Sequence, residues 1–157
     1  MRSSSIHEIK QELVTLKAAE VTALCLRLAR FKKENKELLS YLLFEAQDEQ
    51  NYIKNIKQEI EDLFAEANLS HLYFAKKTLR KILRVINKHS RYSGNKQTDM
   101  ELRIFFCQQL KASGIPLRQN AVLSNIFVGQ LKKIDAALAT LHEDLQHDYR
   151  KEISTLP

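Results

Sequence analysis

The sequence contains little glycine and proline and no tryptophan. Only three Gly and two Pro occur in 157 residues, against an average usage of about 7% and 5%. Because turns and glycine-rich phosphate loops depend on these residues, a β-sandwich, a β-barrel and a nucleotide-binding loop are disfavoured. Hydrophobic residues make up 44% of the chain, which excludes a disordered chain. The length suits one domain over residues 1–157, with frayed ends predicted at 1–4 and 154–157.

An export signal and a membrane span are also missing from the pattern. The N-terminus runs directly into a charged amphipathic segment, with no apolar stretch before a cleavage site. The longest uncharged run, residues 119–131, is shorter than the roughly 20 apolar residues of a spanning helix. The two cysteines, Cys25 and Cys107, lie in apolar helical patterns without the short spacing of a zinc or redox pair. We therefore expect a soluble, cytoplasmic protein without membrane contact, whose cysteines are small buried side chains.

Apolar residues recur at three-four spacing along almost the whole chain, and strict alternation is nearly absent. Glycine ends two of the segments, at Gly94 and at Gly114, where Pro116 also prevents the helix from continuing. The pattern predicts helices at residues 5–16, 18–31, 34–46, 48–66, 70–91, 98–112 and 117–139, with 140–153 either separate or continuous with the preceding helix.

Three hydroxyl residues precede a glutamate by three positions, which is the spacing of a capping box at a helix start. The pairs are Ser5 with Glu8, Thr98 with Glu101 and Thr140 with Glu143. Short links between the helices favour antiparallel neighbours. The sequence thus predicts an all-α fold, an irregular bundle of six to eight mostly antiparallel helices. HEAT- or armadillo-like stacking is the alternative, and it is less favoured because no fixed period of about 33–47 residues appears.

The last third of the chain contains a heptad-like apolar seam. Its members follow one another in steps of four, three, four, three and four residues: Phe127, Leu131, Ile134, Leu138, Leu141 and Leu145. The seam is short for a coiled coil, and its flanking positions do not form a charge-pairing pattern. We interpret it as packing on the protein's own bundle, with self-association through the seam as the alternative.

Acidic and basic residues are segregated along the chain. Residues 45–66 carry seven acids and two lysines, whereas residues 67–98 carry eight cations and no acid. At about 100° per residue, Leu79, Ile82 and Ile86 fall on one side of the second segment and most cations fall on the other. This basic stripe, which we expect to face away from the core and to run into the loop before the next helix, comprises Lys77, Lys81, Arg84, Lys88, Arg91 and Lys96.

Three interpretations of the basic stripe stay open. The acidic segment at 45–66 could fold back and neutralise it, with little gain in stability because exposed ion pairs contribute only ~0–1 kcal/mol each. Alternatively the stripe binds a polyanion such as nucleic acid, by charge or shape and without base reading. The third interpretation is an acidic protein partner. Lys96, next to a helix N-terminus, could also hold an isolated anion.

Motifs that carry chemistry are few. His142 and His147 are five residues apart, so they are turned by about 140° and cannot share one metal from one helix face. The all-helical, magnesium-dependent nucleoside triphosphate pyrophosphatases use an E-E-x-x-E motif followed by E-x-x-D. Here Glu45-x-x-Asp48 comes first and residues 59–62 lack the required spacing. No catalytic, metal or cofactor-binding residue is predicted.

The sequence therefore favours a non-enzymatic protein-interaction or scaffold module. Its contact surface would be the seam at 127–145 or the basic stripe. Non-specific nucleic-acid binding through the basic helix at 76–91 is the first alternative, and a magnesium-dependent pyrophosphatase is the second.

Overall fold

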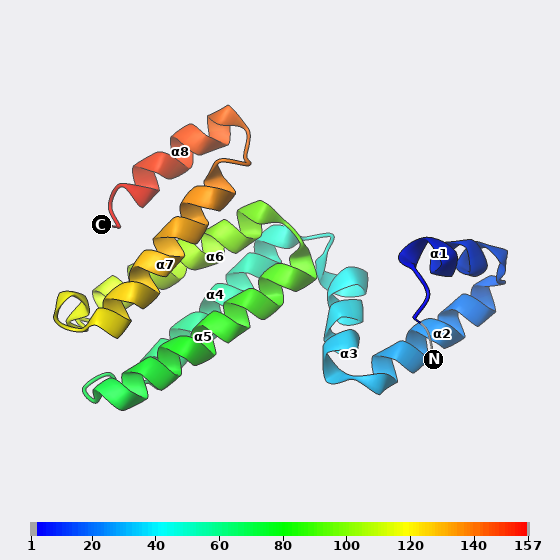
Figure 1. Cartoon of the computed structure of the whole chain (residues 1–157), viewed down its shortest axis with the longest axis horizontal. Coiled ribbons are helices and arrows are strands. Elements are labelled where there is room, and N and C mark those ends of the chain that lie inside the picture. Colours follow the sequence, from blue (N-terminus) through cyan, green and yellow to red (C-terminus); the bar gives the residue numbers. More distant parts are fainter. Residues whose placement is uncertain (1–2, 157) are drawn as a thin grey trace. The chain divides into compact units, whose positions relative to one another are not determined.

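The computed structural model describes residues 3–156, which are helical almost throughout and form no strand (Figure 1). This confirms the all-α prediction. The described helices are α1 (Ile6–Thr15), α2 (Ala18–Phe31), α3 (Lys33–Ser40), α4 (Glu49–Ala65), α5 (Leu72–Ser93), α6 (Lys96–Ala112), α7 (Ala121–Leu138) and α8 (Glu143–Ile153), with a π-helical turn at Tyr41–Glu45 and a 3-10 turn at Leu117–Gln119. No helix within this described range is long and apolar enough to cross a membrane.

The chain divides into two compact units, Met1–Phe44 and Glu45–Pro157. The first, here called unit 1, contains α1, α2, α3 and most of the π-helical turn. The second, unit 2, contains α4 to α8. Whether residues 1–157 behave as one domain stays a prediction.

Three helix boundaries lie at residues that the sequence predicts, namely one helix start and two helix ends. Ser5 caps α1 through the expected capping box, since its Oγ accepts from the N–H of Glu8 at 3.2 Å while its own N–H donates to the Glu8 carboxylate at 2.6 Å. Gly94 and Gly114 both adopt positive φ, 67° and 72°. A side chain would be strained in that left-handed conformation, so each glycine supplies the stop predicted for α5 and α6.

The capping box predicted at Thr98 is wrong. Helix α6 begins two residues earlier, at Lys96, and Asn95 is its N-cap, accepting from the N–H of Gln97 at 2.9 Å. Thr98 is buried, and its hydroxyl donates to the Glu49 carboxylate of α4 at 2.5 Å. Asparagine is as strong an N-cap as serine and stronger than threonine, so the earlier start is favoured.

The capping box predicted at Thr140 is wrong as well. The Thr140 hydroxyl donates back to the carbonyl of Ala137 at 2.7 Å, at the end of α7. His142 is the N-cap of α8, its Nδ1 accepting from the N–H of Asp144 at 3.4 Å. Residues 117–153 therefore begin with the short 3-10 turn and continue with two separate α-helices, α7 and α8, which are joined by a turn.

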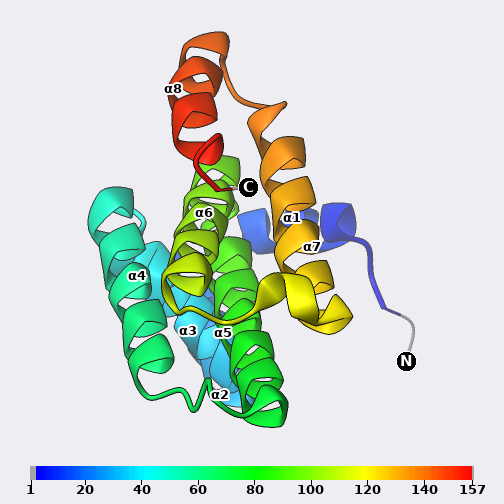
Figure 2. The same ribbon diagram turned by 90° about the vertical axis from the view of Figure 1, so that its left-hand side faces the viewer.

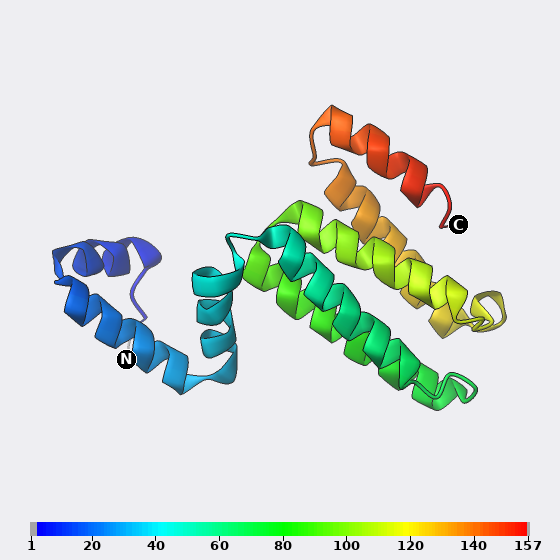
Figure 3. The same ribbon diagram turned by 180° about the vertical axis from the view of Figure 1, so that it is seen from behind.

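Helix α6 is the centre of unit 2, because it packs against α4, α5 and α7 (Figures 2 and 3). It is buried around most of its circumference, whereas each neighbour buries one face. Fully buried apolar side chains are favourable by about 1.5–3 kcal/mol each, so this cluster dominates the stability of unit 2. Its largest fully buried members are Ile60, Leu79, Ile82, Ile86, Met100, Leu102, Ile104, Phe106, Leu110, Leu123 and Ile134.

Polar contacts fasten α8 and the C-terminal end to α6. The Tyr149 hydroxyl donates to the Glu101 carboxylate at 2.5 Å, and Lys111 donates to the carbonyl of Thr155 at 3.0 Å. Leu156 is buried. This apolar side chain has a place in the core, and fraying of residues 1–4 and 154–157 stays a prediction. Positions 1, 2 and 157 lie outside the described residues.

Unit 1, taken by itself, has almost no core. From Ser3 to Ser40 no side chain is buried, and Tyr41 in the π-helical turn is the first that is. Short helices are marginal in water unless an amphipathic face packs against something. The fold thus consists of one well-packed helical unit and one helical unit whose apolar side chains are largely open.

Candidate interaction surfaces

Most of the exposed large apolar side chains of the described structure belong to unit 1. On α2, Leu24, Leu28 and Phe31 lie at steps of four and three residues and therefore share one face. Their exposed fractions are 41%, 60% and 77%. We call these three residues the α2 stripe. Similar apolar positions on α1, including Ile6 and Val14, are also exposed.

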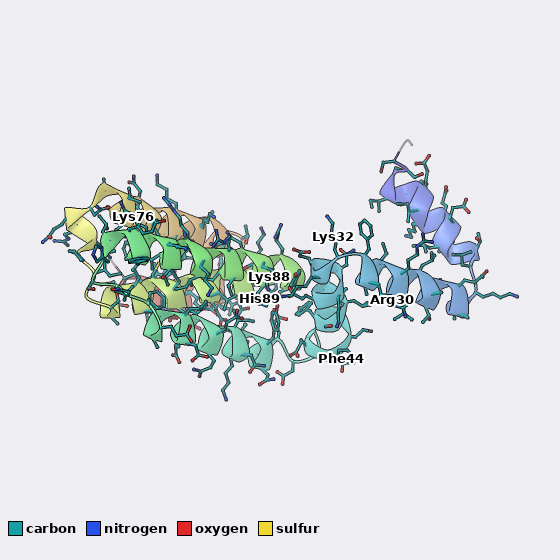
Figure 4. The ribbon with its side chains drawn as sticks, turned by 90° about the horizontal axis from the view of Figure 1, so that it is seen from below. Arg30, Lys32, Phe44, Lys76, Lys88 and His89 are labelled. Carbon is teal, nitrogen blue, oxygen red and sulfur yellow. The ribbon has the colours of Figure 1, made fainter. Side chains whose placement is uncertain are left out.

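Cations surround the end of the α2 stripe. Residues 27–36 contain five basic residues and one acid, Glu34. Arg27 is adjacent to the α2 stripe on the helix surface, and Lys32 directly follows Phe31 in the sequence. Figure 4 labels Arg30 and Lys32 in this part of the chain. Lys33 forms an ion pair with Glu37 at 3.6 Å. The Lys33 side chain is nevertheless 85% exposed and therefore remains accessible to solvent. The surface is apolar with a basic border.

Most cations of the basic stripe lie on α5, on the side opposite its buried face. Ala75, Leu79, Ile82 and Ile86 form the buried face of α5. Lys77, Lys81, Arg84 and Arg91 are exposed on the other side, and their side chains make no hydrogen bond or ion pair in the described structure. Lys88 is half-buried and is not free. Figure 4 labels Lys76 near the start of α5 and Lys88 near its end.

The acidic residues of α4 are directed mainly to other partners. Glu49 accepts from Ser93 and Thr98, which ties α4 to the α5–α6 corner. Glu59 lies 3.6 Å from His89. Since Lys77, Lys81, Arg84 and Arg91 remain exposed and unpaired, α4 does not neutralise the part of the basic stripe that they form.

An open pocket of about 430 Å³ lies at the C-terminal end of this stripe. Three helices line it with cations: α5 contributes Arg91, α6 contributes Lys96 and α7 contributes Lys133. All three side chains are exposed and unpaired in the described structure. We call this feature the Arg91–Lys133 pocket. Lys96, expected to lie beside a helix N-terminus, is the first residue of α6.

The wall of the Arg91–Lys133 pocket is a buried polar network around Arg103, whose side chain is 6% exposed. Its guanidinium donates to both carboxylate oxygens of Asp99 at 3.0 and 2.7 Å, to Gln130 at 2.7 Å and to Asn87 at 2.9 Å. The network therefore joins α5, α6 and α7. Nothing in the local sequence singled out Arg103, apart from the four-residue spacing from Asp99.

Arg103 also determines the ionisation of Asp99, the one carboxylate that lines the pocket. Burial by itself raises the pKa of Asp99. Hydrogen bonds from Arg103, a smaller contribution from the Ser90 hydroxyl and the nearby charges of Arg103 and Lys133 outweigh that effect, so the pKa is lowered. Asp99 and Arg103 thus form a neutral pair, and the charge that remains toward solvent is that of Arg91, Lys96 and Lys133.

The seam at 127–145 is divided by the turn between α7 and α8. Ile134 and Leu138 are buried in unit 2, whereas Phe127, Leu131 and Leu141 are half-buried. Only Leu145, 37% exposed, is open to water. This arrangement supports the interpretation that the seam packs on the bundle. Self-association through it stays a prediction.

The carboxylates at 45–66 are dispersed. Asp48 caps α4 by accepting from the N–H of Asn51 at 3.1 Å, and Asp62 accepts from Gln58 at 3.0 Å. Within residues 3–156, no three His, Cys, Asp or Glu side chains gather in a way that could hold a metal ion.

In comparisons with known proteins, no family model matches the chain, and neither does any curated protein or solved structure.

Proposed function

We propose that the protein is a protein-interaction module whose unit 1 binds a partner protein that has an acidic, partly apolar surface. The observation that carries this proposal is the lack of any buried side chain from Ser3 to Ser40, in helices that nevertheless carry apolar stripes. Burying a leucine or phenylalanine side chain fully is favourable by about 1.5–3 kcal/mol. Covering the exposed parts of the α2 stripe would therefore contribute roughly 3–5 kcal/mol toward binding.

The charge of unit 1 argues for an acidic partner over a second copy. Residues 27–36 have five cations against one acid, and two copies facing each other through the α2 stripe would bring these cations together. Like charges across an interface cost binding energy and suppress the wrong partner. Carboxylates around an apolar groove would instead complement the basic border.

A site-specific photo-crosslinker tests this proposal in cells that express the protein. Placed at Leu28 it is expected to capture a partner, and placed at Leu26 it is expected to capture little. Leu26 is a matched control because it is an exposed leucine, 47% against 60% for Leu28, on the opposite face of α2. The captured protein is then purified and its affinity is measured between about 50 and about 500 mM salt, over which exposed charge pairs are screened.

The proposal predicts direct binding that weakens as salt increases. Capture of the chain's own second copy alone would overturn the acidic partner in favour of self-association. Equal capture from Leu28 and Leu26 would show that the α2 stripe is no interface.

A second function, binding of a nucleic-acid backbone along α5, is supported by the exposed and unpaired side chains of Lys77, Lys81, Arg84 and Arg91. Binding of this kind is electrostatic and weakens steeply with salt. The double variant Lys81→Glu, Arg84→Glu should abolish oligonucleotide binding. An unchanged affinity in this variant would rule the function out.

A further inference from the structure

We infer that the Arg91–Lys133 pocket binds one phosphate group of a nucleic-acid backbone and fixes the end of that backbone on the basic stripe. The inference rests on the second of the two proposed functions and adds a defined site to it. Three unpaired cations from three different helices line one concave site, whereas the cations of α5 alone lie along one helix.

The composition of the site suits a phosphate oxygen. Arg91, Lys96 and Lys133 are N–H donors that carry charge, and hydrogen bonds between charged groups are about twice as strong as neutral ones. The first turn of α6 adds a backbone donor, because the N–H group of Lys96, which lines the pocket, has no acceptor in the described structure. The one carboxylate in the wall, Asp99, is already held by both hydrogen bonds from Arg103.

The buried network gives the site a fixed shape. Arg103 bonds to residues of α5, α6 and α7, the same three helices that carry Arg91, Lys96 and Lys133. Their backbones are consequently held in place before any ligand binds, which lowers the ordering cost of binding. An incoming phosphate has to immobilise only the outer parts of three side chains.

The continuation of the positive charge favours a polymer over a single phosphate. From Lys77 to Arg91 the helix rises by about 21 Å at about 1.5 Å per residue, and its exposed cations recur along that length. An isolated phosphate would use the pocket and leave these cations without a role. A phosphodiester backbone would use both.

The test measures binding of a fluorescein-labelled oligo-uridine of about 20 nucleotides, a length that exceeds the roughly 4–16 nucleotides covered by common single-strand binding folds. The variants are Lys133→Ala and its matched control Lys132→Ala. Both remove one exposed lysine from neighbouring positions of α7, but Lys132 does not line the pocket. The net charge of the two variants is the same.

We expect Lys133→Ala to weaken binding by at least about fivefold at low salt and to reduce the salt slope by about 0.7, the value for one phosphate of a single strand that is no longer neutralised. Lys132→Ala should change the affinity by less than twofold. Equal effects of the two variants would overturn the pocket inference while the double variant Lys81→Glu, Arg84→Glu still tests the stripe. If the unmodified protein does not bind the oligonucleotide, both the stripe function and the pocket inference fail.

Discussion

Replacement of Arg103 by methionine should destabilise unit 2 strongly. The change removes four hydrogen bonds, two of them to Asp99 and one each to Gln130 and Asn87. Breaking a buried ion pair by removing one partner costs about 3–5 kcal/mol. The Asp99 side chain is 22% exposed, so water replaces part of the loss and we expect about 3 kcal/mol.

Urea unfolding followed by circular dichroism measures this free energy. For a chain of this size about 3 kcal/mol corresponds to a decrease in Tm of roughly 6–12 °C. The matched control is Arg118→Met, at an exposed arginine that makes no side-chain hydrogen bond or ion pair in the described structure. Surface changes of that kind stay within about 0.5 kcal/mol. If Arg103→Met costs no more than this control, the reasoning on the buried network is refuted.

The same variant makes a prediction about pH. Because the pKa of Asp99 is lowered in the folded protein, its stabilising contribution is present above the unfolded value of about 3.9 and is lost as pH falls through the folded pKa. The difference in unfolding free energy between the unmodified protein and Arg103→Met should therefore be largest near neutral pH and should narrow below about pH 4. A difference independent of pH would mean that the Asp99 charge does not contribute.

Three further predictions concern the packing of unit 2 and its titrating groups. Ile134→Ala should lower the free energy of unfolding by about 2–4 kcal/mol because Ile134 is fully buried. Leu145→Ala, at an exposed position of the same seam, should lower it by less than about 1 kcal/mol. Equal losses of unfolding free energy in urea would contradict the division of the seam into a buried and an exposed part. Burial, followed by the hydrogen bond to a neighbouring carboxylate, raises the pKa of Tyr149. An ultraviolet titration should therefore contain a tyrosine step above the usual value of about 10, and Tyr149→Phe should remove that step. Burial raises the pKa of Cys107 to about 12, so a thiol reagent at pH 8 should modify Cys25 first. Intact mass measurement of the unmodified protein and of Cys25→Ser follows this labelling. Labelling of Cys107 in the variant that is faster than labelling of Cys25 in the unmodified protein would contradict the prediction.

The helices of the fold could be predicted from the sequence because apolar periodicity and two glycines act locally. The helix starts were harder, since several residues compete to cap the same turn. At α6 the asparagine at position 95 caps the helix, and Thr98 is drawn to Glu49, 49 residues away. Such a long-range partner leaves no local signal.

The candidate surfaces were predictable to different degrees. The exposure of Lys77, Lys81, Arg84 and Arg91 follows from helical geometry on one segment, whereas Lys88 is half-buried, and the binding role of the stripe stays a prediction. The pocket could not be predicted because Lys133 comes from α7, and the role of Arg103 depends on partners 16 and 27 residues away. The open state of unit 1 was hidden for another reason. An apolar stripe in a sequence indicates that a helix packs against something, but it does not say whether the cover belongs to the same chain.

The most direct measurement of the central claim is the affinity of the purified, photo-captured partner for Leu28→Asp compared with Leu26→Asp. Both variants place one aspartate at an exposed leucine of α2, so they change charge and helix propensity equally. We expect Leu28→Asp to weaken binding by at least about thirtyfold, the equivalent of about 2 kcal/mol, because it removes an apolar side chain from the interface and buries a charge in its place. Leu26→Asp should leave the affinity within about threefold. Equal decreases in affinity, or no decrease for Leu28→Asp, would contradict the assignment of unit 1 as the partner-binding surface.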